Sequence, residues 1–202
     1  MLRYLYIAGG AYLAICIAAI LLRPKTPAPA PAPTPSSAHS GSAVVVPSGQ
    51  GDGASWYATI KPYCNSVEVE TAQQRSPAPD TPDGLGYSAA CYALAGKIDQ
   101  ARAAIERLSS GQRSYAAGIV FNVGHPVADA GDDKSAGPIM ELVIDYQPNN
   151  YMALYHAGMS EYALGQPAPA TLHLKRFLEL YSSPDGWRSN AITVLGRLAS
   201  GS

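Results

Sequence analysis

YMALYHAGMSEYALGQPAPATLHLKRFLELYSSP, residues 151–184, is the stretch of the chain that decides the fold. It holds two segments with apolar residues at helical spacing, about 150–164 and 168–181, and Gly165 lies between them. A glycine at this place commonly ends a helix, and a proline such as Pro184 punctuates the segment that follows. The stretch therefore predicts two α-helices joined by a tight turn.

The same pattern recurs earlier in the chain. Shifting the sequence by 69 residues, about two periods of 34, aligns small residues with small ones and apolar residues with apolar ones. The aligned pairs are Ala89 with Gly158, Gly96 with Gly165, Ala101 with Ala170, Ile105 with Leu174, and Leu108 with Phe177, and Ala136, Met140 and Val143 lie one period before the last three. Small residues recur where two helices must cross closely, and apolar residues recur at the i, i+4 and i+7 positions that face a neighbour.

These residues resemble the tetratricopeptide repeat family. The best copy, 151–184, carries Leu154, Gly158, Tyr162, Gly165, Ala170 and Phe177, and the copy before it ends in IDYQPNN, close to the usual ending of that family. The resemblance covers about 120 of the 202 residues. The chain departs from the family in three ways. Leu108, Val143 and Phe177 replace the alanine of the second helix, only Pro148 keeps the terminal proline, and the middle copy carries about six extra residues between its helices.

The expected fold is therefore all-α, a short tetratricopeptide-like array of antiparallel helix pairs, in a domain that spans 54–202. We expect repeats at about 82–114, 111–150 and 151–184, and a C-terminal capping helix at 186–199. An interrupted helical segment at about 54–74 precedes them. No stretch shows the sustained alternation of apolar and polar residues that is typical of strands.

The resemblance also implies a binding surface. Stacked helix pairs leave a concave face that is lined by the first helix of each pair, and in the family this face binds peptides or proteins. The residues implied here are Tyr115, Ile119 and Asn122 in the middle copy, and Tyr155, Met159 and Tyr162 in the last. The alternative is that several of them pack against neighbouring helices.

The amino terminus predicts a membrane anchor at 1–23. Residues 4–22 read YLYIAGGAYLAICIAAILL, and this run of nineteen residues without a charge would span about 28 Å as a helix. A cleaved signal peptide is the alternative, but the apolar run is long and is followed directly by Arg23 and Pro24. Gly10, Ala14 and Ala18 share one face, which suits packing against another membrane helix or an anchor without a partner.

Residues 24–53 predict a disordered tether. They contain seven prolines together with many alanines, serines and glycines, and no aromatic residue. Such a composition favours polyproline II and buries too little surface to order itself. We expect a single-pass membrane protein (of the inner membrane, in a bacterium) whose helical domain lies outside the cytoplasm.

The cysteines are Cys16 in the apolar run and Cys64 and Cys91 in the helical domain. No C-x-x-C pattern occurs, which argues against a zinc ribbon or a thioredoxin-like centre. Cys64 and Cys91 either form a disulfide in an oxidising compartment or stay as two buried thiols.

The sequence offers little that predicts chemistry. A formal net charge of -1 and the absence of a basic patch argue against nucleic-acid binding. His125, Asp129, Asp132 and Asp133 lie in the insertion GHPVADAGDDKSAG, residues 124–137, which we interpret as a flexible loop. These side chains either bind a divalent cation or cap the next helix.

The expected function is a membrane-anchored scaffold that contacts protein partners or subunits of a membrane complex. We expect no catalytic residues, no enzyme activity, no metal and no cofactor. The alternatives are a metal-dependent enzyme that uses the loop at 124–137 and a purely structural subunit.

Overall fold

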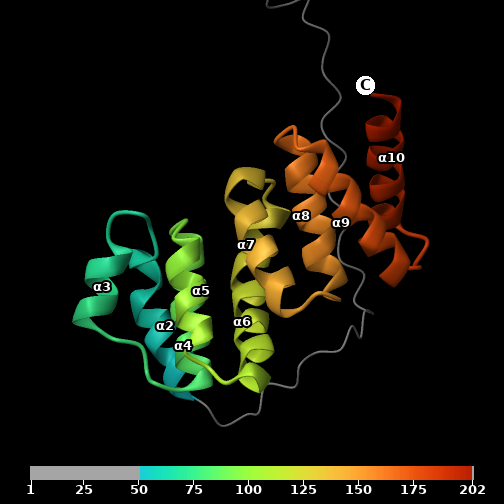
Figure 1. Cartoon of the computed structure of the whole chain (residues 1–202). Coiled ribbons are helices and arrows are strands. Elements are labelled where there is room, and N and C mark those ends of the chain that lie inside the picture. Colours follow the sequence, from blue (N-terminus) through green and yellow to red (C-terminus); the bar gives the residue numbers. More distant parts are fainter. Residues whose placement is uncertain (1–50, 202) are drawn as a thin grey trace, which may run out of the picture. The chain divides into compact units, whose positions relative to one another are not determined.

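The computed structural model describes residues 51–201 (Figure 1). The predicted anchor at 1–23, with Gly10, Ala14 and Ala18, and nearly all of the predicted tether lie outside the described residues. Within the described part, no helix is both long enough and apolar enough to cross a membrane.

The described residues form helices and no strands, so the prediction of an all-α domain is confirmed for this part of the chain. Residues 51–201 contain nine α-helices and one short 3-10 helix, η1. Their bounds are α2 Gly51–Ile60, η1 Lys61–Tyr63, α3 Val69–Arg75, α4 Pro82–Leu94, α5 Ile98–Glu106, α6 Ser110–Asp129, α7 Asp133–Tyr146, α8 Tyr151–Ala163, α9 Pro167–Leu180 and α10 Gly186–Ser200.

Local signals set several of the helix ends. Side-chain oxygens of Thr81, Asn150 and Asp185 accept hydrogen bonds from backbone amides in the first turns of α4, α8 and α10. Gly96 and Gly165 follow α4 and α8 with φ of 71°, a backbone conformation that other residues adopt at a cost. Both glycines end their helices where the sequence predicts.

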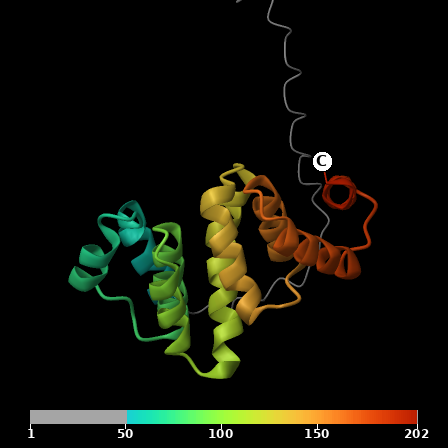
Figure 2. The ribbon, with the colours of Figure 1, turned by 45° about the horizontal axis from the view of Figure 1, so that its top comes forward.

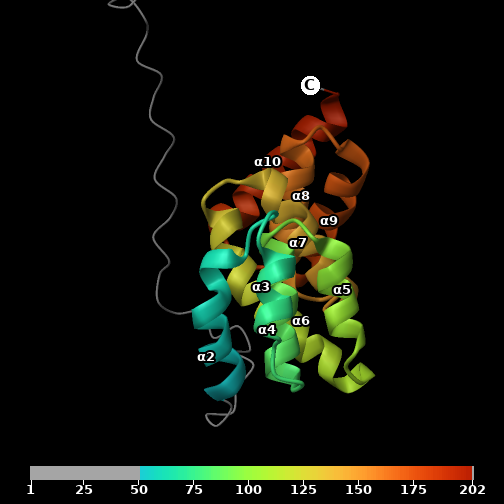
Figure 3. The same ribbon diagram turned by 90° about the vertical axis from the view of Figure 1, so that its left-hand side faces the viewer.

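Consecutive helices pack side by side as the chain runs back and forth. Helices α4 and α5, α6 and α7, and α8 and α9 make close pairs (Figures 1 and 2). The pairs then stack, because α4 packs against α6, and α7 packs against α8. Helix α2 covers α4 at the amino-terminal end of the domain (Figure 3).

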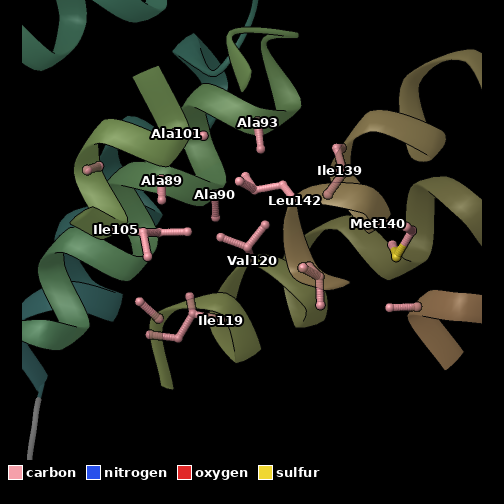
Figure 4. Close-up of a cluster of buried hydrophobic side chains, with 14 of the residues drawn as sticks. Ala89, Ala90, Ala93, Ala101, Ile105, Ile119, Val120, Ile139, Met140 and Leu142 are labelled. Carbon is pink, nitrogen blue, oxygen red and sulfur yellow. The ribbon is translucent and has the colours of Figure 1, made fainter. Parts of the chain in front are cut away.

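The core contains many small side chains, which lets the helix axes approach one another. Ala89 and Ala101 are fully buried and pack with larger residues such as Ile105 and Val120 (Figure 4). Ala116 is fully buried in the same cluster. A second cluster on α8, α9 and α10 is built around Leu154, Leu174, Phe177, Tyr181, Ala191 and Val194.

Gly158 shows why the sequence repeats a small residue at this position. A Cβ atom there would lie 2.7 Å from Cγ of Leu174 and 3.2 Å from the backbone nitrogen of the same residue. Helices α8 and α9 therefore cross closely at this position, where the periodicity predicts a small residue.

The prediction that residues 124–137 form a flexible loop is wrong. Helix α6 continues through Pro126 to Asp129, and α7 begins at Asp133, so only three residues separate the two helices. The extra residues of the middle copy lengthen α6 by more than one turn. Asp132 caps α7, because its side chain accepts a hydrogen bond from the backbone nitrogen of Ser135.

Candidate functional site

The six residues that the family resemblance implies do not form one exposed surface. Ile119 and Tyr155 are buried, with 7% and 4% of their surface exposed. Ile119 packs closely against Gly86 of α4, and Tyr155 packs between Phe177 and Trp187. The packing of α4, α9 and α10 covers these two side chains, as in the alternative that the sequence leaves open, and partner binding by them stays a prediction.

The other four positions remain partly or fully accessible. The hydroxyl of Tyr115 donates to Asp83 Oδ1 at 3.1 Å, so this half-buried side chain ties α6 to α4. Asn122 is exposed, and Met159 and Tyr162 are partly buried against the carboxyl-terminal core cluster. Partner binding by these four residues stays a prediction.

Cys64 and Cys91 form a disulfide bond with an S–S distance of 2.05 Å. The bond joins the residue after η1 to the buried face of α4 and encloses α3 in a covalent loop. Of the two alternatives that the sequence leaves open, the structure contains the bonded pair.

A pocket of about 420 Å³ lies where α5, α7, α8 and α9 meet, and we call it the α7–α9 pocket. Its size falls in the lower part of the range of small-ligand sites. It combines apolar walls with an unusual number of charged groups. Its lining residues are Ile98, Arg102, Pro138, Glu141, Leu142, Ile144, Asp145, Glu161, Pro169 and His173.

Glu161 forms the buried side of this pocket, with 2% of its surface exposed. Nδ1 of His173 lies 2.9 Å from both carboxylate oxygens of Glu161. The hydrogen bond to Glu161 raises the pKa of His173 above its ordinary value, against the opposing effect of burial. A charged imidazole beside the carboxylate gives Glu161 a compensating partner across the α8–α9 seam.

Glu141 approaches the same carboxylate from α7. Burial raises the pKa of Glu141, and the negative charge of Glu161 raises it further, while the charge of His173 acts in the opposite direction. None of the ion pairs within residues 53–201 involves Glu141. Its ionised form is therefore poorly compensated in the pocket.

A second ion pair completes the pocket on its α5 side. Nη2 of Arg102 donates to Oδ2 of Asp145 at 2.6 Å, and both side chains are partly exposed. The pocket thus presents three carboxylates, Glu141, Asp145 and Glu161, against two cations. With all carboxylates ionised, the group carries one unbalanced negative charge, and this charge favours a cationic ligand.

This pocket was not predicted from the sequence. Glu161 and His173 lie twelve residues apart on opposite sides of the turn at Gly165, and the predicted interface follows the first helix of each pair instead. The sequence does contain one signal. Glu161 and His173 lie on the two helices of the best repeat copy, and the other residues where these helices face each other are apolar or small. A carboxylate at a packed seam must have a partner, because an isolated buried charge is very costly.

Another cluster, at the end of α6, is the one group of the described residues whose donors converge as metal ligands do. It consists of His125, Asp129 and His156, and its ligand atoms lie within 4.8 Å of one another. Burial and, to a lesser extent, the neighbouring His125 lower the pKa of His156 to about 3. Asp132 and Asp133, which the sequence groups with His125, do not belong to this cluster: Asp132 caps α7, and Asp133 Oδ1 accepts a hydrogen bond from the hydroxyl of Ser160 at 3.3 Å.

Comparison of the chain with protein-family models, with curated proteins and with solved structures found no match.

Proposed function

We propose that the chain is a membrane-anchored interaction scaffold whose helical domain binds a protein partner through a lysine or arginine side chain seated in the α7–α9 pocket. One observation carries the proposal. The nearly fully buried carboxylate of Glu161 lies in a pocket beside a second carboxylate, Glu141, whose pKa is raised.

The electrostatics of the pocket favour a basic side chain over a neutral or acidic one. The raised pKa of Glu141 means that its ionised form is less favourable here than in water. An ammonium or guanidinium group near Glu141 and Glu161 restores the balance of charge, and hydrogen bonds to ionised carboxylates are among the stronger ones. The apolar walls, among them Ile98, Leu142 and Ile144, suit the methylene stem of the same side chain.

The rest of the chain supports an interaction role. The domain is a tetratricopeptide-like array in our interpretation, and such arrays bind proteins along surfaces built from successive helices. The disulfide fits a domain that works in an oxidising compartment. The predicted anchor and tether would hold such a domain near a membrane, where subunits of a membrane complex are available as partners.

The proposed binding surface differs from the one that the family resemblance implies. Helices α5, α7 and α9, which supply most of the lining of the pocket, are the second helices of their pairs. Helix α8, a first helix, contributes only Glu161. The partner would therefore approach the second helices of the array rather than the first.

Two short peptides test the proposal on the full chain in mild detergent. One is an acetylated and amidated Gly-Gly-Lys-Gly-Gly peptide, and the other carries norleucine in place of lysine, which keeps the apolar stem and removes the charge. The readout is the NMR signal of the His173 ring. We expect a saturable shift with the lysine peptide and none with the norleucine peptide.

Variants locate the binding. Glu141→Gln should weaken the binding of the lysine peptide about tenfold, which corresponds to about 1.4 kcal/mol of binding free energy. Glu179→Gln is the matched control, because Glu179 lies on α9 and pairs only with Arg176 at the exposed surface. Equal responses to the two peptides, no response to either, or unchanged binding by Glu141→Gln would each contradict the proposal.

A further inference from the structure

The second polar cluster, formed by His125, Asp129 and His156, lies outside the α7–α9 pocket and takes no part in the proposed function. His125 and Asp129 are four residues apart on the last turns of α6, so their side chains share one face of that helix. His156 reaches the same point from the middle of α8. Two helices that are far apart in the sequence thus bring two imidazoles and one carboxylate together.

Three distances define the cluster. Nε2 of His125 lies 2.9 Å from Nε2 of His156, and Oδ1 of Asp129 lies 3.7 Å from the first nitrogen and 3.8 Å from the second. In the plane of these three atoms, the point equidistant from them lies about 2.0 Å from each. Bonds from zinc to histidine nitrogen and carboxylate oxygen are about 2.0–2.2 Å long.

We propose that His125, Asp129 and His156 form a binding site for one divalent first-row transition-metal ion. Two imidazole nitrogens and one carboxylate oxygen are donors that suit zinc and its neighbours in the series, and three protein ligands leave at least one coordination position open.

The surroundings hold the donors in place. The ring of Phe121 stacks on His125 with a centroid separation of 4.9 Å, and the ring of Trp187 packs edge-on against His156 at 5.5 Å. His156 is buried, whereas Asp129 is half exposed. Fixed imidazoles on one side and an accessible carboxylate on the other give a metal ion both a preformed geometry and a path of entry.

A direct hydrogen bond between the two imidazoles is the competing explanation for the 2.9 Å separation, because one ring nitrogen can donate to the other. In this explanation Asp129 is at most the ion-pair partner of a protonated imidazole and is not a metal ligand. The two explanations therefore differ in what the carboxylate of Asp129 does, and a variant at this residue separates them.

The test measures zinc binding by the full chain, purified without a histidine tag, stripped with a chelator and titrated in competition with a chromophoric zinc indicator. We expect one zinc ion per chain. Asp129→Asn and His125→Ala should each weaken zinc binding by more than about 100-fold. The reason is that even the loss of a residue that only hydrogen-bonds a metal ligand lowers metal affinity roughly 10–100-fold. His39→Ala and Asp99→Asn are the matched controls and should bind as the unmodified chain does.

A second readout does not depend on the indicator. Trp187 is one of two tryptophans, so a Trp56→Phe variant reports on the cluster through Trp187 alone. Stoichiometric copper(II) should quench this fluorescence, and Asp129→Asn should abolish the quenching at the same concentration. Circular dichroism of each variant separates loss of ligands from loss of fold.

Two results would overturn the proposal. The first is an absence of zinc and copper binding at micromolar concentration by the folded chain. The second is binding that Asp129→Asn retains in full, which would leave the hydrogen bond between the imidazoles as the explanation of the cluster.

Discussion

Removing the bond between Cys64 and Cys91 should destabilise the amino-terminal part of the helical domain. The two cysteines are 27 residues apart in the sequence. In the loop-closure description, a cross-link of this span removes enough entropy from the unfolded chain to stabilise the fold by about 3.5 kcal/mol. This value is an upper estimate for the bond, because residual structure in the unfolded chain reduces it.

The structure indicates where the loss will appear first. The bonded loop contains α3, which buries only Val69 and Gln73 among its own residues. Helix α2 packs along α4 directly, whereas α3 is otherwise tied to α4 mainly by the buried hydrogen bonds between Gln73 and Ser88. Without the disulfide, α3 keeps few other ties to α4, so residues 61–76 should open before α2 and the rest of the domain.

The assay compares two variants in mild detergent. Both carry Cys16→Ser, which prevents pairing through the remaining cysteine, and one also carries Cys64→Ser and Cys91→Ser. If the free energy of unfolding falls by about 2 kcal/mol per molar urea, a loss of about 3.5 kcal/mol of stability lowers the urea concentration at the unfolding midpoint by about 2 M. Unfolding is followed by circular dichroism at the helix band.

Two outcomes would refute this reasoning. Equal urea midpoints would show that the loop closure contributes nothing to stability. Two free thiols per chain in the denatured, unreduced Cys16→Ser protein would show that the bond does not form.

Two further predictions concern the α8–α9 seam. Gly158→Ala should destabilise the domain, because overpacking against Leu174 costs about 1–3 kcal/mol and exceeds the gain of about 1 kcal/mol in helix propensity; thermal unfolding measures the difference. The NMR titration of His173 should show a pKa above 6.5, raised by Glu161 and, more weakly, by Glu141. Because the folded pKa is raised, this pair stabilises the fold fully below pH 6.5, and the contribution is lost as the pH rises through the folded pKa.

Matched variants control both measurements. Gly196→Ala places the same methyl group in the interior of α10 with nothing within 4 Å, so it should stabilise the domain by up to about 1 kcal/mol. His173→Gln should remove the dependence of stability on pH that the pair contributes. A Gly158→Ala variant that is as stable as the unmodified chain would count against the close packing at Leu174, and a pKa of His173 below 6.5 would count against the ion pair.

The sequence predicts the helices well because their signals are local. Thr81, Gly96, Gly165 and Asp185 act within their own turns, so the ends of α4, α8 and α10 can be read without knowledge of the neighbours. The repeat of small residues also predicts a close crossing at Gly158, because no larger side chain leaves room for Leu174.

The insertion at 124–137 shows where local reasoning failed. The glycines and Pro126 favour a loop, but α6 continues through them. Its last turns lie against α8 through the contact between His125 and His156, and such tertiary contacts override weak propensity.

The sequence groups His125 with Asp129, but it does not add His156 to them, and it does not pair Glu161 with His173. The pairing of Glu161 with His173 and of His125 with His156 depends on which faces of α6, α8 and α9 meet, and helical periodicity alone does not fix the rotation of one helix against another. The burial of Ile119 and Tyr155 has the same origin.

Carboxyl carbon NMR of Glu141, recorded against pH with and without the lysine peptide, tests the α7–α9 pocket most directly. Our account predicts a raised pKa for Glu141 in the free chain and a lower pKa once the peptide's ammonium group is bound beside it. A Glu141 carboxyl that titrates identically in both samples, under conditions where the peptide is bound, would contradict the account.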